Sequence, residues 1–132
     1  MLSWLLGEAR GDDARACLAA ADLVLASSLT LVECDRVLIR ATVMGALDEA
    51  VAGERRSRLA RAAEHWILFD LDAAIVERAR QPVPREPVRT LDALHLATAT
   101  VARSLVPDLL LLSLDERVRD AGRLLGLGLL PD

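Results

Sequence analysis

Three carboxylates, Glu33, Asp92 and Asp115, stand where an acid is an awkward choice for a purely structural residue. Glu33 lies in "SSLTLVECDRVLIR" with apolar residues on both sides, Asp92 lies near the start of the apolar stretch "RTLDALHLATA", and Asp115 ends the apolar run "LLLLSLD". Carboxylate oxygens suit Mg²⁺ or Mn²⁺. If folding gathers these acids, the cluster would hold such an ion, activate water and stabilise charge on a phosphodiester.

Each acid also has an ordinary structural interpretation. Asp92 would favour a helix N-terminus by roughly 0.3 to 1 kcal/mol through the helix dipole, and Asp115 would be the N-cap of the following helix. Glu33 would pair with an arginine on a neighbouring turn. The long separations between the three acids follow no local metal-ligand spacing, so residue chemistry alone leaves both interpretations open.

The elements that must position these acids follow from the apolar pattern. Short, hardly alternating runs are typical of strands covered on both faces, and longer amphipathic stretches between them indicate helices. The pattern predicts strands at 22–28, 65–71, 109–115 and 127–132. Helices are expected at about 2–8, 12–20, 29–44, 46–63, 72–80, 90–104 and 115–125, and the proline-rich segment 81–89 is expected to be a loop.

Strands that alternate with helices favour a three-layer α/β/α sandwich with a mostly parallel sheet of four to five strands. Asp115 would then lie at the carboxyl edge of the sheet, where open α/β folds bind ligands. Arg36 and Arg40 follow Glu33 on one helical face and would reach phosphate there, or else pair with acids such as Asp35. His95, three residues after Asp92, would touch the same pocket or lie at the edge of the core.

Composition limits the function classes. The 132 residues are 53% hydrophobic with a net charge of −4, and all 16 basic residues are arginines. A single soluble domain is expected, without a broad cationic surface for nucleic acid. No apolar run is long enough to span a membrane, and the opening residues do not predict a secretion signal. Cys17 and Cys34 lack metal-binding spacing, so a reducing, cytoplasmic setting is expected.

Read in order, "SSLTLVECDRVLIRA", "RTLDALHLATA" and "LLLSLDERVRDAGRLLGL" resemble the acidic motifs of the PIN-domain family, and more narrowly of VapC-like toxins. The resemblance implies an Mg²⁺- or Mn²⁺-dependent endoribonuclease of a type II toxin–antitoxin pair, with RNA as substrate, a cognate antitoxin and a homodimer. It also implies that Glu33, Asp92 and Asp115 are the family's second, third and fourth acids. Ser113 takes the small hydroxyl position before the last acid, and Arg89 lies at the rim of the site.

This sequence departs from the family pattern at its start. Family members open with a strand that ends in an acid, only a few residues before the part that matches "LSWLLGE", and residues 1–132 are therefore expected to form one N-terminally shortened PIN-like domain. Either the start codon has been placed too late, which we favour because the rest of the core is intact, or the chain is a shortened relative.

The departure leaves a second functional hypothesis, a catalytically impaired PIN fold that only binds an antitoxin or another copy of itself. A third interpretation makes all three acids helix caps in an unrelated α/β module. The resemblance also assigns antitoxin binding to the arginine-rich helix "ALDEAVAGERRSRLARAAE", whose charges would otherwise form a solvated face. Its four arginines are Arg55, Arg56, Arg58 and Arg61.

Overall fold

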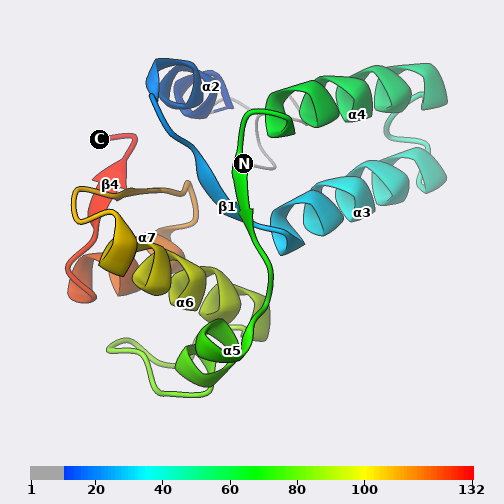
Figure 1. The fold of residues 1–132 in the computed structure, drawn as a ribbon. Helices are drawn as coiled ribbons and strands as arrows, with labels where there is room; N and C mark the ends of the chain where they lie inside the picture. The colour runs from blue at the N-terminus through cyan, green and yellow to red at the C-terminus, as the bar shows by residue number, and fades with distance from the viewer. Residues whose placement is uncertain (1–10) are drawn as a thin grey trace. The chain divides into compact units, whose positions relative to one another are not determined.

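The computed structural model describes residues 11–132 and divides the chain into two compact units, one running to Leu68 and the other starting at Phe69 (Figure 1). The predicted helix at 2–8 and the "LSWLLGE" stretch lie outside the described residues. Each unit has its own buried apolar cluster, so the two are described separately.

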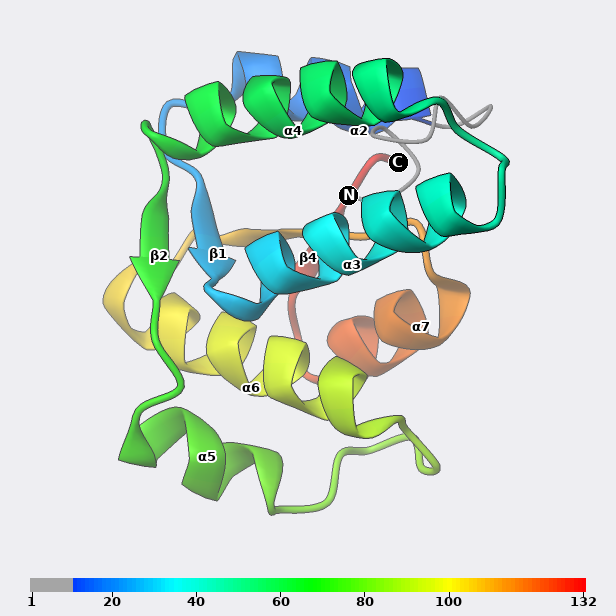
Figure 2. The same cartoon turned by 90° about the vertical axis from the view of Figure 1, so that its right-hand side faces the viewer.

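The first unit is built around a pair of helices, α3 (Leu29–Val43) and α4 (Glu49–Ala63), which lie side by side in Figures 1 and 2. Its buried centre is Cys34 of α3 against Leu59 of α4. Gly45, with a φ of 71°, follows α3 and turns the chain, a conformation that costs residues with a side chain more than it costs glycine. The remaining elements are α2 (Gly11–Ala20), β1 (Leu25–Ser27) and β2 (Ile67–Phe69), whose last residue is the first of the second unit.

The second unit packs α6 (Thr90–Leu105) against α5 (Ala73–Ala79) and α7 (Glu116–Leu124). Its strands, β3 (Leu110–Leu112) and β4 (Gly128–Leu130), pair in parallel, with Leu110 opposite Gly128 and Leu112 opposite Leu130. The buried cluster of this unit consists of Val83, Leu96, Val118 and Ala121. α6 therefore contributes to the core through Leu96 while its first turn carries Asp92.

The predicted elements correspond closely to the observed ones. All four observed strands lie inside the predicted segments, and each of the six described helices begins and ends within three residues of its prediction. Asp72 is the N-cap of α5, where its carboxylate accepts a hydrogen bond from the Ile75 amide. Gly126, with a φ of 77°, follows the end of α7. Residues 81–89 contain no helix or strand.

The α/β class is confirmed, but a single sheet of four to five strands is not. The described residues form two sheets of two strands each, β1 with β2 and β3 with β4. The strands are three residues long, shorter than the apolar runs that predicted them. Apolar runs report burial and not hydrogen-bond partners, which explains why strand positions were predicted better than sheet size. Within residues 11–132 no helix combines the length and apolarity that crossing a membrane requires.

Candidate functional site

Asp92 lies in the first turn of α6, directly before residues that enter the core. Its side chain is partly buried, yet within residues 11–132 its carboxylate has no hydrogen-bond or ion-pair partner. The N-cap of this helix is Arg89, which makes no capping side-chain bond, and Thr90 is the first helical residue. Asp92 thus receives at most a dipole stabilisation from the helix, and burial of an unpaired carboxylate opposes it.

Asp115 follows β3 and is the N-cap of α7, as the structural interpretation predicted. Its Oδ1 accepts hydrogen bonds from the amides of Arg117 at 2.8 Å and Val118 at 3.3 Å. Oδ2 of this exposed side chain makes no hydrogen bond with residues 11–132. One carboxylate oxygen therefore serves the helix, and the other is available to a ligand.

Ser113 shapes the turn that carries Asp115. The hydroxyl of Ser113 accepts a hydrogen bond from the Asp115 amide at 3.2 Å, and the Ser113 amide donates to the carbonyl of Leu130 at 3.1 Å, one residue beyond the end of the β3–β4 ladder. The hydroxyl at this position thus has a structural partner in addition to any role toward substrate.

Glu33 is partly buried on α3, in the first unit, and is engaged in an interaction within the protein. Its neighbour Cys34 is fully buried. Burial, reinforced by the negative charges of Glu33 and Asp35, raises the pKa of the Cys34 thiol to about 11. Cys34 is therefore a protonated core residue at neutral pH, and a thiolate would not compete with carboxylates for a metal there.

The three acids belong to different parts of the chain, Glu33 to the first unit and Asp92 with Asp115 to the second. No group of three or more histidine, cysteine, aspartate or glutamate side chains in the described part of the chain has an arrangement that would hold a metal ion. The gathering of these three acids at one ion therefore stays a prediction.

The arginines considered as phosphate ligands are exposed. Arg36 and Arg40 of α3 and Arg89 before α6 make no ion pair with any described residue. Asp35, the expected structural partner on α3, instead accepts a hydrogen bond from Arg56 of α4 at 3.0 Å. These three guanidinium groups are thus available to an anion from solution. His95, one turn after Asp92, is partly buried and has an interaction within the protein.

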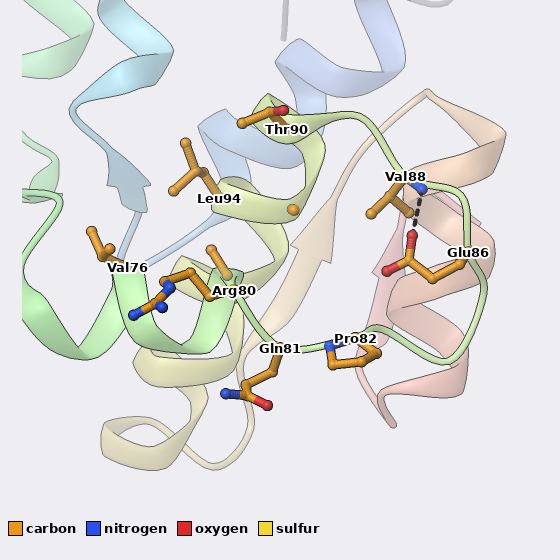
Figure 3. A pocket seen from close by; sticks show the side chains of 10 residues that line it. Val76, Arg80, Gln81, Pro82, Glu86, Val88, Thr90 and Leu94 are labelled. Atoms are coloured by element: carbon orange, nitrogen blue, oxygen red, sulfur yellow. Dashed lines mark hydrogen bonds between the residues drawn. The ribbon is translucent and has the colours of Figure 1, made fainter.

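A hollow of about 560 Å³ lies in the second unit between α5, the loop that follows it and the start of α6 (Figure 3). Its charged and amide side chains, Arg80, Gln81 and Glu86, already have partners. Arg80 and Gln81 both bond to Glu77, and the Glu86 carboxylate accepts from the amides of Val83 and Val88, the second of which is drawn in Figure 3. Neither Asp92 nor Arg89 lines this hollow, so we assign it no part in the candidate site.

Sequence reasoning missed Arg119. This residue lies on α7 one turn after Asp115, is 6% exposed, and donates hydrogen bonds to backbone carbonyls around the Asp115 turn. Its neighbours Val118, Ala121 and Gly122 are buried. The available signal was the position of this arginine beside the apolar side of an amphipathic helix. An arginine at such a position is expected to be buried, and buried arginines are rare unless they have partners.

Comparison with known proteins gives consistent results. Residues 1–124 match the PIN domain family. Ribonuclease VapC46 of Mycobacterium tuberculosis (strain ATCC 25618 / H37Rv) is 40% identical over 95 residues, which cover 70% of this chain and 68% of that protein. Ribonuclease VapC35 of M. tuberculosis, from strain CDC 1551 / Oshkosh, is 41% identical over 59 residues, which cover 45% of this chain and 43% of that protein.

Proposed function

The chain belongs to the PIN domain family, and from this premise we propose that it is a metal-dependent endoribonuclease and the toxin of a type II toxin–antitoxin pair. The resemblance to PIN domains of the VapC type, predicted from the three acidic stretches, is confirmed by the family match and the VapC relatives. The names of those relatives describe ribonucleases, which supports RNA as the substrate of this chain. We also propose that residues 1–132 act as one domain.

The observation that carries the proposal is the state of Asp92. A partly buried carboxylate that makes no hydrogen bond or ion pair within residues 11–132 gives up part of its hydration without a protein partner. A residue in this state, within the stretch "RTLDALHLATA" that resembles a family motif, is better explained by a ligand than by packing. A divalent cation is the ligand that would offset the buried negative charge.

The donor chemistry of the acids fits Mg²⁺ or Mn²⁺. We propose Glu33, Asp92 and Asp115 as the ligands, with Asp115 contributing the oxygen that α7 does not use. All donors are hard carboxylate oxygens, the type that these ions prefer. When bound, the ion supplies an acidified water and neutralises charge on the phosphodiester.

The arginines account for substrate binding. Arg36, Arg40 and Arg89 are exposed and without ion-pair partners in the described chain, so each can donate to phosphate oxygens. Ser113 shapes the Asp115 turn and would hydrogen bond substrate, and His95, one turn after Asp92, is proposed as an accessory residue.

A cognate antitoxin and a second copy of the chain are the proposed protein partners. On α4, Arg56 pairs with Asp35 and Arg58 pairs with Glu54, whereas Arg55 and Arg61 make no ion pair with described residues. The latter two are the stronger candidates for an acidic antitoxin segment. Both cysteines are free thiols, which suits the reducing cytoplasm in which we place the protein.

Asp92→Asn tests the proposal, because asparagine keeps the shape of the side chain and removes its charge. We expect the parent chain to cleave single-stranded RNA with Mg²⁺ or Mn²⁺ and to stop when the metal is chelated, and we expect Asp92→Asn to lose at least about 99% of this activity. Asp108→Asn, the same change at an exposed loop position of the same unit, should leave cleavage unchanged. Metal-dependent cleavage that survives Asp92→Asn would rule out the assigned site.

A second candidate is a non-catalytic PIN protein that binds an antitoxin or another copy of itself. The observation in its favour is that residues 11–132 contain no arrangement of three metal-ligating side chains. Mn²⁺ titration of the chain separates the two functions. Saturable binding that Asp92→Asn abolishes supports the nuclease, and no binding at millimolar Mn²⁺ supports the non-catalytic protein.

A further inference from the structure

Arg119 is a buried cation whose side-chain hydrogen-bond partners among the described residues are all backbone carbonyls. Its Nη1 donates to the Ser113 carbonyl at 2.9 Å and to the Leu130 carbonyl at 3.0 Å, and its Nη2 donates to the Pro131 carbonyl at 2.9 Å. No carboxylate among the described residues forms an ion pair with it. Burying a guanidinium costs free energy unless the group is well hydrogen bonded. The three carbonyls therefore offset the cost of burying Arg119.

The three carbonyls lie where the parallel strands β3 and β4 end. Leu130 is the last residue of β4, Pro131 follows it, and Ser113 follows the last residue of β3. The Leu130 carbonyl accepts from both the Ser113 amide and the Arg119 guanidinium. Arg119 thus fixes the carboxyl ends of both strands to α7.

Asp115 lies between the groups that Arg119 holds. The Arg119 side chain bonds the carbonyl of Ser113, two residues before Asp115, and the Arg119 amide donates to the Asp115 carbonyl at 2.9 Å. The second of these bonds is the ordinary i to i−4 backbone bond of α7, which any residue except proline would make at this position, so the anchor specific to arginine is the one at Ser113. We propose that Arg119 is a positioning residue that holds the Asp115 carboxylate in place for cation binding. This proposal rests on the proposed function for its metal readout but not for its structural readout.

Packing alone does not explain an arginine here. A leucine would also fill space beside Val118 and Gly122, but it would leave the carbonyls of Ser113 and Pro131 without the hydrogen bonds that Arg119 donates. Outer groups that orient metal ligands typically change metal affinity by about 10- to 100-fold when they are removed. We expect Arg119 to act at this level on Asp115.

The experiment compares Arg119→Leu and Arg119→Lys with Arg123→Leu, a matched control on the same helix whose exposed guanidinium pairs with Asp120. The structural readout is hydrogen exchange at the amides of Arg117 and Val118, which bond to Asp115 Oδ1. The functional readout is Mn²⁺ affinity by calorimetry. Amides in the middle of α6 report whether the second unit as a whole remains folded.

Arg119→Leu should speed exchange at the two cap amides at least about tenfold without changing α6, and should weaken Mn²⁺ binding about 10- to 100-fold. Arg119→Lys keeps the charge but has fewer donors in a less rigid arrangement, so it should restore part of the protection of the cap amides and part of the Mn²⁺ affinity. Arg123→Leu should change neither the exchange rates of the cap amides nor the Mn²⁺ affinity. If Arg119→Leu unfolds the unit, the lysine variant carries the test through the same two amides.

Unchanged exchange at the cap amides in a folded Arg119 variant would overturn the positioning role. Mn²⁺ binding by such a variant as tight as that of the parent chain would overturn it as well. A parent chain that binds no Mn²⁺ is a separate outcome, which contradicts the proposed function, and the exchange measurement then decides on Arg119 by itself.

Discussion

Replacing Asp115 by asparagine and by alanine separates the capping role that the structure shows for this residue from the metal-binding role that we propose for it. One carboxylate oxygen caps α7 through the amides of Arg117 and Val118, and the other makes no bond within the described chain. Asparagine keeps an acceptor for the two amides but carries no charge, whereas alanine removes both the acceptor and the charge. If the free oxygen binds metal, both variants should lose Mn²⁺ binding, and only alanine should lose the cap.

The magnitudes follow from the cap geometry. Loss of an N-cap acceptor costs about 1 kcal/mol, in a range of roughly 0.5 to 2. Removal of the charge from a helix N-terminus costs roughly 0.3 to 1 kcal/mol, and less at an exposed side chain such as this one. Asp115→Ala should therefore unfold about 1 kcal/mol more easily than Asp115→Asn, which should stay within about 0.5 kcal/mol of the parent chain.

The assays are urea unfolding followed by circular dichroism and Mn²⁺ titration of the folded proteins. Asp72 provides the control, because it caps α5 through the Ile75 amide at 2.9 Å and has no proposed metal role. Asp72→Ala should reproduce the loss of stability without affecting Mn²⁺ affinity. Equal destabilisation by asparagine and alanine at position 115 would refute the cap argument, and undiminished Mn²⁺ binding by Asp115→Asn would refute the metal argument.

Three further predictions concern stability and titration. Gly53 lies in the interior of α4, where an added Cβ meets no atom within 4 Å. Gly53→Ala should therefore raise the free energy of unfolding, measured by urea titration, by roughly 0.5 to 1 kcal/mol. Gly45→Ala, at a φ of 71°, should lower the free energy of unfolding in the same measurement. Leu96→Ala removes a fully buried side chain of α6 and should lower the free energy of unfolding by about 2 to 5 kcal/mol. Leu105 lies on the same helix and is 70% exposed, so Leu105→Ala should lower it by less than about 0.5 kcal/mol. Because the pKa of Cys34 is raised from 9.0 to about 11, its contribution to stability is present below pH 9 and is lost as the pH rises toward 11. Urea unfolding at pH 8 and pH 10.5 should show this fall in the parent chain and a smaller fall in Cys34→Ala.

The sequence was sufficient to locate the helices and strands because each has a local signal. Glycine after α3 and α7, and aspartate before α5, mark helix ends that the structure has at the same residues. The pairing of the strands could not be predicted in the same way, because a three-residue strand does not encode which strand it pairs with. Strand pairing is a property of distant segments, and it needs coordinates.

The sequence predicted the family of the candidate site, whereas the assignment of its residues stays a prediction and their surroundings needed coordinates. The types and motifs around positions 33, 92 and 115 led to the family, which the comparisons confirm. The sequence left two interpretations open for Asp115, a helix cap and a metal ligand. The hydrogen bonds show the cap, and the second carboxylate oxygen leaves the metal interpretation open. The position of Arg119 beside the apolar side of α7 was a signal of its burial, but its carbonyl partners are backbone groups that no residue type identifies.

The lack of partners for Asp92 within residues 11–132 has an evolutionary consequence. Folding gives this residue no hydrogen bond to preserve, so if Asp92 binds the proposed ion, a lineage that stopped using that ion would drift to a neutral or apolar side chain there at an early stage. Position 115 would change more slowly, because helix α7 continues to require an acceptor at its first turn. In decayed descendants of this chain, asparagine or serine at 115 beside an altered residue at 92 would record that loss.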